Sequence, residues 1–96
     1  MNGDRHFNKQ FLCACLDQDH YRFQPSTWKQ LLELQISLND TLHVLRHGSI
    51  DEEPEFDATL GHWRFTAHGK SVDEKELTIT FAFVETEGVL ILTIAE

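Results

Sequence analysis

Residues 62–68 have the residue types and spacing best suited to chemistry. They read His-Trp-Arg-Phe-Thr-Ala-His, so polar and apolar residues alternate without a break. Neighbouring side chains of a β-strand point to opposite faces, so this pattern predicts a half-buried strand. Its apolar face is formed by Trp63, Phe65 and Ala67, and its polar face by His62, Arg64, Thr66 and His68.

The predicted polar face can support proton transfer and anion binding. Histidine changes its charge near neutral pH, so His62 and His68 are candidates for an acid and a base. Arg64 can hold a phosphate or carboxylate through its planar guanidinium, and Lys70 follows the end of the strand. Because His62 and His68 are separated by about 20 Å on one strand, a site would combine Arg64 with one histidine and a group from another element. The alternative is an ordinary solvated strand face.

The negative charge of the chain is concentrated in its second half. The 96 residues carry a net charge of −8, with five acids and five Lys or Arg in residues 1–48, but eleven acids and three bases in residues 49–96. Such a surface repels RNA and DNA, so we expect another protein as partner and no direct nucleic-acid binding. The candidate binding residues are Lys70, Asp51, Glu52, Glu53 and Glu55, although a solvated loop explains the acidic segment as well.

The remaining reactive side chains are assigned structural roles. Cys13 and Cys15 are two positions apart, which disfavours a disulfide between them, and each is expected to fill space in the core. His43 and His47 share a helix face near a helix C-terminus, where the dipole favours a cationic ring, so a metal site is the weaker alternative. We therefore predict neither metal nor cofactor. Free thiols without a targeting or membrane-spanning segment predict a cytoplasmic protein.

Three helices are expected in the first half of the chain. The first runs from a cap at Asp4 to about residue 17, followed by an extended link at residues 21–24. The second begins at Pro25, with Ser26 or Thr27 as its cap. The third has a short capping box and ends at a glycine. The capping residues are Ser37 and Asp40, and the stop is Gly48. The expected core-facing residues include Trp28, Leu31, Leu32, Leu38, Thr41, Leu42 and Leu45.

Strands are expected in the second half, at about residues 62–68, 77–84 and 89–94, with residues 49–51 as a candidate edge strand. The acidic segment between them is too charged for a central strand, and Phe56 is expected to anchor it to the core. Residues 89–92 are apolar on both faces, so the last strand is covered by the chain itself or by a second copy, which leaves a homodimer open. The order of elements predicts one α+β domain over residues 1–96, with two or three N-terminal helices packed on a three- to four-stranded antiparallel sheet.

Short motifs from residue 36 onward resemble small bacterial domains related in fold to the RelE/ParE toxins of toxin–antitoxin systems. The matching segments are residues 36–40, 44–50, 63–65, 69–70, 76–78 and 89–94. The resemblance implies a helical pair followed by an antiparallel sheet. Members of the wider superfamily cleave messenger RNA on the ribosome or bind a topoisomerase. In this chain Ser26, Gln30 and Leu34 stand where the similar domains commonly have a histidine and arginines.

The sequence supports two hypotheses about function. We favour a non-catalytic, protein-binding module of RelE-like fold, because the helical half is neutral, the sheet half is acidic and the basic residues of the similar domains are missing. The alternative is a ribosome-assisted messenger-RNA endoribonuclease. In that case Arg64 would steady the phosphate, and His68 or His62 would move protons.

Overall fold

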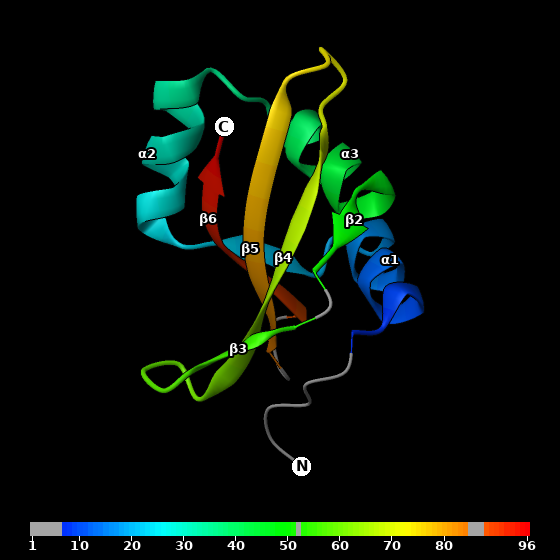
Figure 1. The fold of residues 1–96 in the computed structure, drawn as a ribbon, viewed down its shortest axis with the longest axis vertical. Coiled ribbons are helices and arrows are strands. Elements are labelled where there is room, and N and C mark those ends of the chain that lie inside the picture. Colours follow the sequence, from blue (N-terminus) through cyan, green and yellow to red (C-terminus); the bar gives the residue numbers. More distant parts are fainter. Residues whose placement is uncertain (1–6, 52, 85–87) are drawn as a thin grey trace.

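A computed structural model describes residues 7–51, 53–84 and 88–96, and it has an α+β fold (Figure 1). Its helices are α1 (Lys9–Asp17), α2 (Pro25–Leu34) and α3 (Leu38–His47). Its strands are β1 (Tyr21–Phe23), β2 (Ser49–Ile50), β3 (Glu55–Asp57), β4 (His62–Lys70), β5 (Glu76–Val84) and β6 (Gly88–Ala95). Within these residues no helix is both long and apolar enough to cross a membrane.

The strands form one mixed sheet in the order β1-β6-β5-β4-β2, with β3 also paired to β4. Strands β2 to β6 pair antiparallel, whereas β1 pairs parallel to β6. The prediction of a three- to four-stranded antiparallel sheet is therefore wrong, since six strands are described and one pairing is parallel. The expected link at residues 21–24 is strand β1, and part of the acidic segment is strand β3. Each is only three residues long, too short for a period-two pattern to identify.

Helices α1 and α3 lie on one side of the sheet and cover its apolar face (Figure 1). Phe65 and Ala67 of β4 are buried there, as the alternation of the strand predicts. Phe81 of β5 and Ile91 of β6 occupy the same core, together with Leu45 of α3. The predicted assignment of the β4 apolar face is therefore confirmed, although Trp63 at its start is only partly buried.

The opposite face of the sheet has a second, smaller apolar cluster. Ala82, Leu90 and Leu92 are buried on it, with Leu60 and Val84 packed against them. Leu60 belongs to the turn between β3 and β4, which lies on the side of the sheet away from α1 and α3 (Figure 1). Strand β6 is therefore covered on both faces by its own chain, so burial of its apolar residues does not require a second copy.

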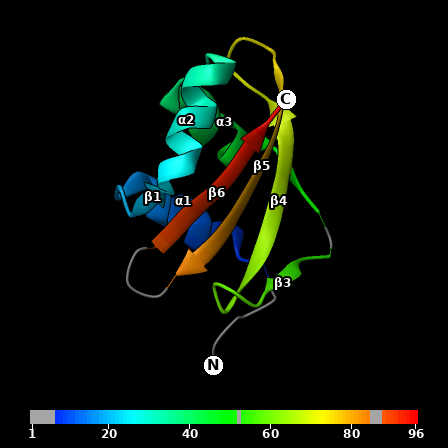
Figure 2. The ribbon, with the colours of Figure 1, turned by 90° about the vertical axis from the view of Figure 1, so that its left-hand side faces the viewer.

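Helix α2 runs alongside β6 (Figure 2). It bonds to the part of the β6 edge that lies beyond the three residues paired with β1. The Thr27 hydroxyl donates to the Leu92 carbonyl at 2.8 Å, and the Ile94 amide donates to Gln30 Oε1 at 2.7 Å. The prediction that Ser26 or Thr27 caps α2 is therefore wrong. The N-cap is Gln24, which makes no side-chain capping bond, and Pro25 occupies the first turn.

Helix α1 begins later than expected. Its N-cap is Asn8, whose Oδ1 accepts from the Phe11 amide at 3.0 Å, while Asp4 lies outside the described residues. Its C-terminal end is tied to α3 by an ion pair of 2.7 Å between Asp17 and Arg46. Cys15 is buried and burial raises the pKa of its thiol, whereas Cys13 is partly exposed, and both are free.

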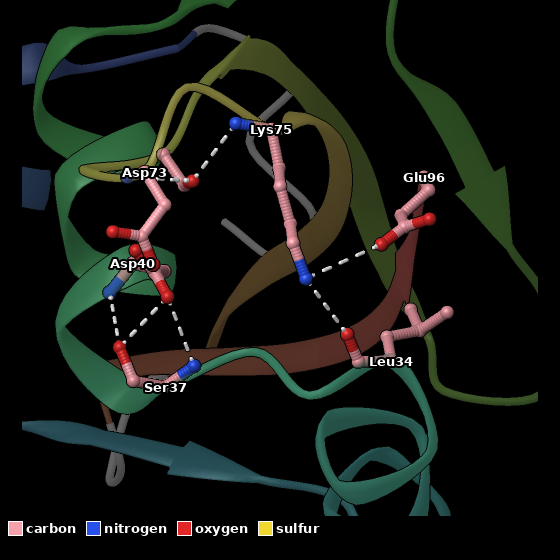
Figure 3. Close-up of polar contacts among 7 residues, drawn as sticks. Leu34, Ser37, Asp40, Asp73, Lys75 and Glu96 are labelled. Atoms are coloured by element: carbon pink, nitrogen blue, oxygen red, sulfur yellow. Dashed lines mark hydrogen bonds and ion pairs between the residues drawn. The ribbon is translucent and has the colours of Figure 1, made fainter.

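The predicted capping box of α3 is confirmed, and it also joins the helix to the sheet (Figure 3). The Asp40 amide donates to Ser37 Oγ at 3.1 Å, and Asp40 Oδ2 accepts from the Ser37 amide at 3.1 Å. The other carboxylate oxygen accepts from the Val72 amide in the β4–β5 loop at 3.2 Å. Beside it, Lys75 Nζ donates to the Leu34 carbonyl at 3.3 Å and lies 3.9 Å from Glu96. These bonds fix the ends of α2 and α3 against the β4–β5 loop.

The pKa of the buried Asp40 carboxyl is lowered from its ordinary value of 3.8. Burial alone would raise the pKa, but hydrogen bonds from Ser37 and from the Val72 amide, with the Lys75 ammonium nearby, favour the charged form and outweigh burial. A group whose pKa is lower in the folded state stabilises the fold above its unfolded pKa. That contribution is lost as the pH falls through the folded pKa.

We predict that Asp40→Asn lowers the free energy of unfolding at pH 7 by about 1–3 kcal/mol, because the Ser37 and Val72 amides lose a charged acceptor. The difference from the original protein should shrink as the pH is lowered below about 4. Urea unfolding between pH 3 and pH 7 measures both effects. The exposed neighbour Asp73→Asn is the control. If the free energy of unfolding lost in Asp40→Asn did not change with pH, the lowered pKa of Asp40 in the folded state would be contradicted.

Candidate functional site

The polar face of β4 lies on the side of the sheet opposite α1 and α3, and its cross-strand neighbours come from β5 on one side and from β2 and β3 on the other. Arg64 is in register with Ala82, His68 with Thr78, and Lys70 with Glu76. This face therefore changes along its length from an apolar end at Ala82 to a polar end at Lys70. The candidate residues are spread over that length.

His68 contacts one side chain through each of its two ring nitrogens. Its Nε2 lies 2.9 Å from Asp51 Oδ1, and its Nδ1 lies 3.2 Å from Thr78 Oγ1. Asp51 directly follows β2, and its amide donates to the Thr66 carbonyl at 2.9 Å, which fixes the start of the acidic segment beside β4. The imidazole is 45% exposed and so remains accessible. The Asp51 carboxylate after β2, the His68 imidazole of β4 and the Thr78 hydroxyl of β5 thus lie in one line, joined by an ion-pair contact and a hydrogen bond.

A polar hollow of about 340 Å³ lies beside this line, between β2, β4 and β5. Ser49, His68 and Thr78 line it together with Gly69 and Leu77, and the charged side chains at its end are Lys70 and Glu76. A small ligand therefore has access to the imidazole, the threonine hydroxyl and an ammonium group.

Arg64 is held by acids of the neighbouring strand. Its Nη2 lies 3.4 Å from Glu55 Oε1 and its Nε lies 3.8 Å from Asp57 Oδ2. The Nε atom is buried and has no hydrogen-bond partner among the described residues. The guanidinium is thus partly neutralised by two carboxylates of β3, which compete with any phosphate for it.

The three predicted catalytic residues do not form one cluster. Arg64 and His68 are four residues apart on one strand, or about 13 Å. His62 lies at the beginning of β4, in register with Asp57. Lys70 is closer to His68, two positions along the same face. The hollow therefore combines His68 with Lys70 and Thr78, whereas Arg64 and His62 lie beside β3.

The predicted acidic binding residues lie along the opposite edge of the sheet from β1. Asp51, Glu53 and Glu55 are exposed there, and Glu52 lies outside the described residues. Phe56 is 51% exposed, with its ring 5.3 Å from that of Trp63. It therefore packs on Trp63 at the surface of β3, and it does not anchor the segment inside the core as expected.

An apolar groove at the β1 edge was missed by the sequence analysis. It has a volume of about 360 Å³, and its walls come from β1, α2 and α3: Tyr21, Arg22, Phe23, Trp28 and Leu38. The Trp28 ring lies 4.6 Å from the Phe23 ring. Because β1 ends the strand order, one of its two edges has no strand partner among the described residues.

The side chains around this groove were expected in the core. Trp28 is 50% exposed, Leu32 is 80% exposed and Leu38 is 38% exposed, so that prediction is wrong. Of the residues predicted to face the core from α2, Leu31 is buried, and Thr27 is buried beside it. A second apolar stripe on α2 could have predicted this exposed surface. Trp28 and Leu32 are four residues apart and share a helix face, which is not the face of the buried residues.

Comparison of the chain with protein-family models, with curated proteins and with solved structures gave no match. Among the described residues no group of three or more His, Cys, Asp or Glu side chains is arranged to hold a metal ion. The His43 and His47 rings lie 4.7 Å apart on α3.

Gly48 positions the hollow, because it lets the end of α3 approach β4. A Cβ at this position would lie 2.5 Å from the His68 carbonyl oxygen and 2.6 Å from the Val44 carbonyl oxygen, both in the backbone. We predict that Gly48→Ala lowers the free energy of unfolding by about 1–3 kcal/mol, measured by urea denaturation. Ser49→Ala, at the exposed neighbour, should change it little. A Gly48→Ala protein as stable as the original would contradict the close approach.

Proposed function

We propose that this chain is a small cytoplasmic protein-binding module that takes an extended segment of a partner protein at the β1 edge. The observation that carries this proposal is the apolar groove beside β1, the strand that ends the strand order of the described residues. Exposed edges of sheets accept an added strand, whose main chain supplies affinity while a neighbouring pocket takes a side chain. Here β1 offers the edge, and Trp28 and Leu38 form the pocket wall.

Two further properties support a protein partner. Tryptophan is enriched among the residues that dominate binding energy, and Trp28 is half exposed against the Phe23 ring. The acidic half of the chain favours a partner of opposite charge, because complementary charge speeds association and disfavours like-charged competitors. We therefore expect an apolar segment at the β1 edge, and Lys or Arg on the parts of the partner that face the acidic half of the chain.

A RelE-like fold is part of the same proposal. The helical pair α2–α3 followed by the antiparallel strands β4, β5 and β6 supports it. Strand β1 and helix α1 are additions that the resemblance does not include.

The proposal is tested by selecting peptides from a random library on the folded protein and measuring their affinity by titration. Trp28→Ala should weaken the selected peptides by about 30-fold, because truncation of a central aromatic residue costs about 2 kcal/mol. Phe56→Ala is the matched control, since Phe56 is an equally exposed aromatic on the other edge of the sheet. Peptides that lose affinity with Phe56→Ala but not with Trp28→Ala would overturn the placement of the binding site.

A second candidate is a ribosome-assisted messenger-RNA endoribonuclease that uses Arg64 with His68 or His62. The contact between His68 and Asp51 favours His68 as its base, because a carboxylate that accepts from one ring nitrogen orients the other as a proton acceptor.

The nuclease candidate predicts cleavage of a defined messenger RNA in a cell-free translation mixture, mapped by primer extension. The Arg64→Ala, His68→Ala double variant should lose the cuts, whereas His43→Ala on α3 should keep them. Cuts that persist in the double variant would remove these residues from the mechanism, and no cuts with the original protein would remove the nuclease candidate.

A further inference from the structure

We propose that Thr78 is a nucleophilic hydroxyl, activated by His68 and Asp51, that accepts acyl groups from activated carboxylic esters. The proposal goes beyond protein binding and involves the opposite end of the sheet from the β1 groove. It rests on the position of His68 between two side chains, with a hydrogen bond to the Thr78 hydroxyl and an ion-pair contact to the Asp51 carboxylate.

The two contacts of His68 define a consistent proton arrangement. An ionised carboxylate only accepts hydrogen bonds, so the imidazole nitrogen at 2.9 Å from Asp51 carries the proton. In a neutral ring the other nitrogen is then an acceptor, and it lies 3.2 Å from Thr78 Oγ1. The threonine hydroxyl can therefore donate to the imidazole, which is the relation between a nucleophile and its general base.

The hollow next to Thr78 has room for a small acyl group. Its volume of about 340 Å³ is open to solvent, and Lys70 lies at its end, on the same face of β4 as His68. An ammonium near the reacting carbonyl would stabilise the negative charge that develops on its oxygen. We therefore expect the acyl donor to be small and activated, with a neutral or anionic leaving group.

In the proposed step, Thr78 Oγ1 attacks the carbonyl carbon of the ester and forms a new carbon–oxygen bond, while its proton moves to His68 Nδ1. The bond between the carbonyl carbon and the leaving oxygen then breaks, and the leaving group takes the proton from His68. Asp51 accepts from the other ring nitrogen throughout and stabilises the imidazolium. The product is an O-acyl threonine and a free alcohol or phenol.

The same strand supplies an internal control. Thr80 is two residues further along β5, on the same face and similarly half-buried, but it is in register with Thr66 and not with a histidine. A general hydroxyl reactivity would modify both threonines. An activated nucleophile would modify Thr78 alone.

The test is acetylation by p-nitrophenyl acetate, with nitrophenolate release followed in time and the adducts located by peptide mass spectrometry. Thr78 should be acetylated at least about 10-fold faster than Thr80. His68→Gln, which keeps a hydrogen-bonding side chain but cannot take a proton, should slow acetylation of Thr78 by about 100-fold. Thr78→Val should abolish that adduct, and Thr78→Ser should keep it.

Asp51 is a positioning residue in this proposal, so its test needs a readout beyond loss of rate. Asp51→Ala should slow acetylation of Thr78, and Asp51→Glu should restore part of the rate, with urea unfolding unchanged in both. Equal acetylation of Thr78 and Thr80 would overturn the proposal. So would a Thr78 rate that is insensitive to His68→Gln, or adducts confined to lysines.

Discussion

Burial of one face of the β4, β5 and β6 strands beneath α1 and α3 is the constraint on which the candidate sites depend. Phe65 and Ala67 must point into that core, so the residues that alternate with them, Thr66 and His68, point to the other face. A shift of one residue would bury His68 and expose Ala67, at a cost the small core could not offset. Packing of apolar side chains therefore places His68 opposite Thr78 and beside the polar hollow.

The two edges of the sheet are completed in different ways, and this gives them different surface side chains. At one edge, β6 is paired by β1 and by side chains of α2, which brings Trp28 to the surface next to an open strand edge. At the other edge, β2 and β3 pair with β4 and bring carboxylates to its histidines and arginine. The first edge is apolar and suited to a partner segment. The second is polar and suited to proton transfer.

The sequence predicts the features that depend on local patterns. The alternation in β4 predicts its two faces, and the spacing of Ser37 and Asp40 predicts the capping box of α3. It does not predict β1, whose three residues become a strand only because β6 lies beside them. Nor does it predict that Thr27 bonds to β6 or that Asp51 and Thr78 meet His68. These contacts depend on which strands pair and in what register, and that is set by the packed fold rather than by spacing along the chain.

Mapping a selected peptide on the protein by two-dimensional nitrogen-15 NMR would test most directly whether the β1 edge is the binding surface. A peptide added as a strand changes the environment of the backbone amides that it approaches. The account predicts that the largest shift changes occur at the amides of Tyr21–Phe23 and at the Trp28 indole. Changes concentrated at Ser49–Ile50 and Glu55–Asp57 would contradict it and would place the interaction surface at the acidic edge of the sheet.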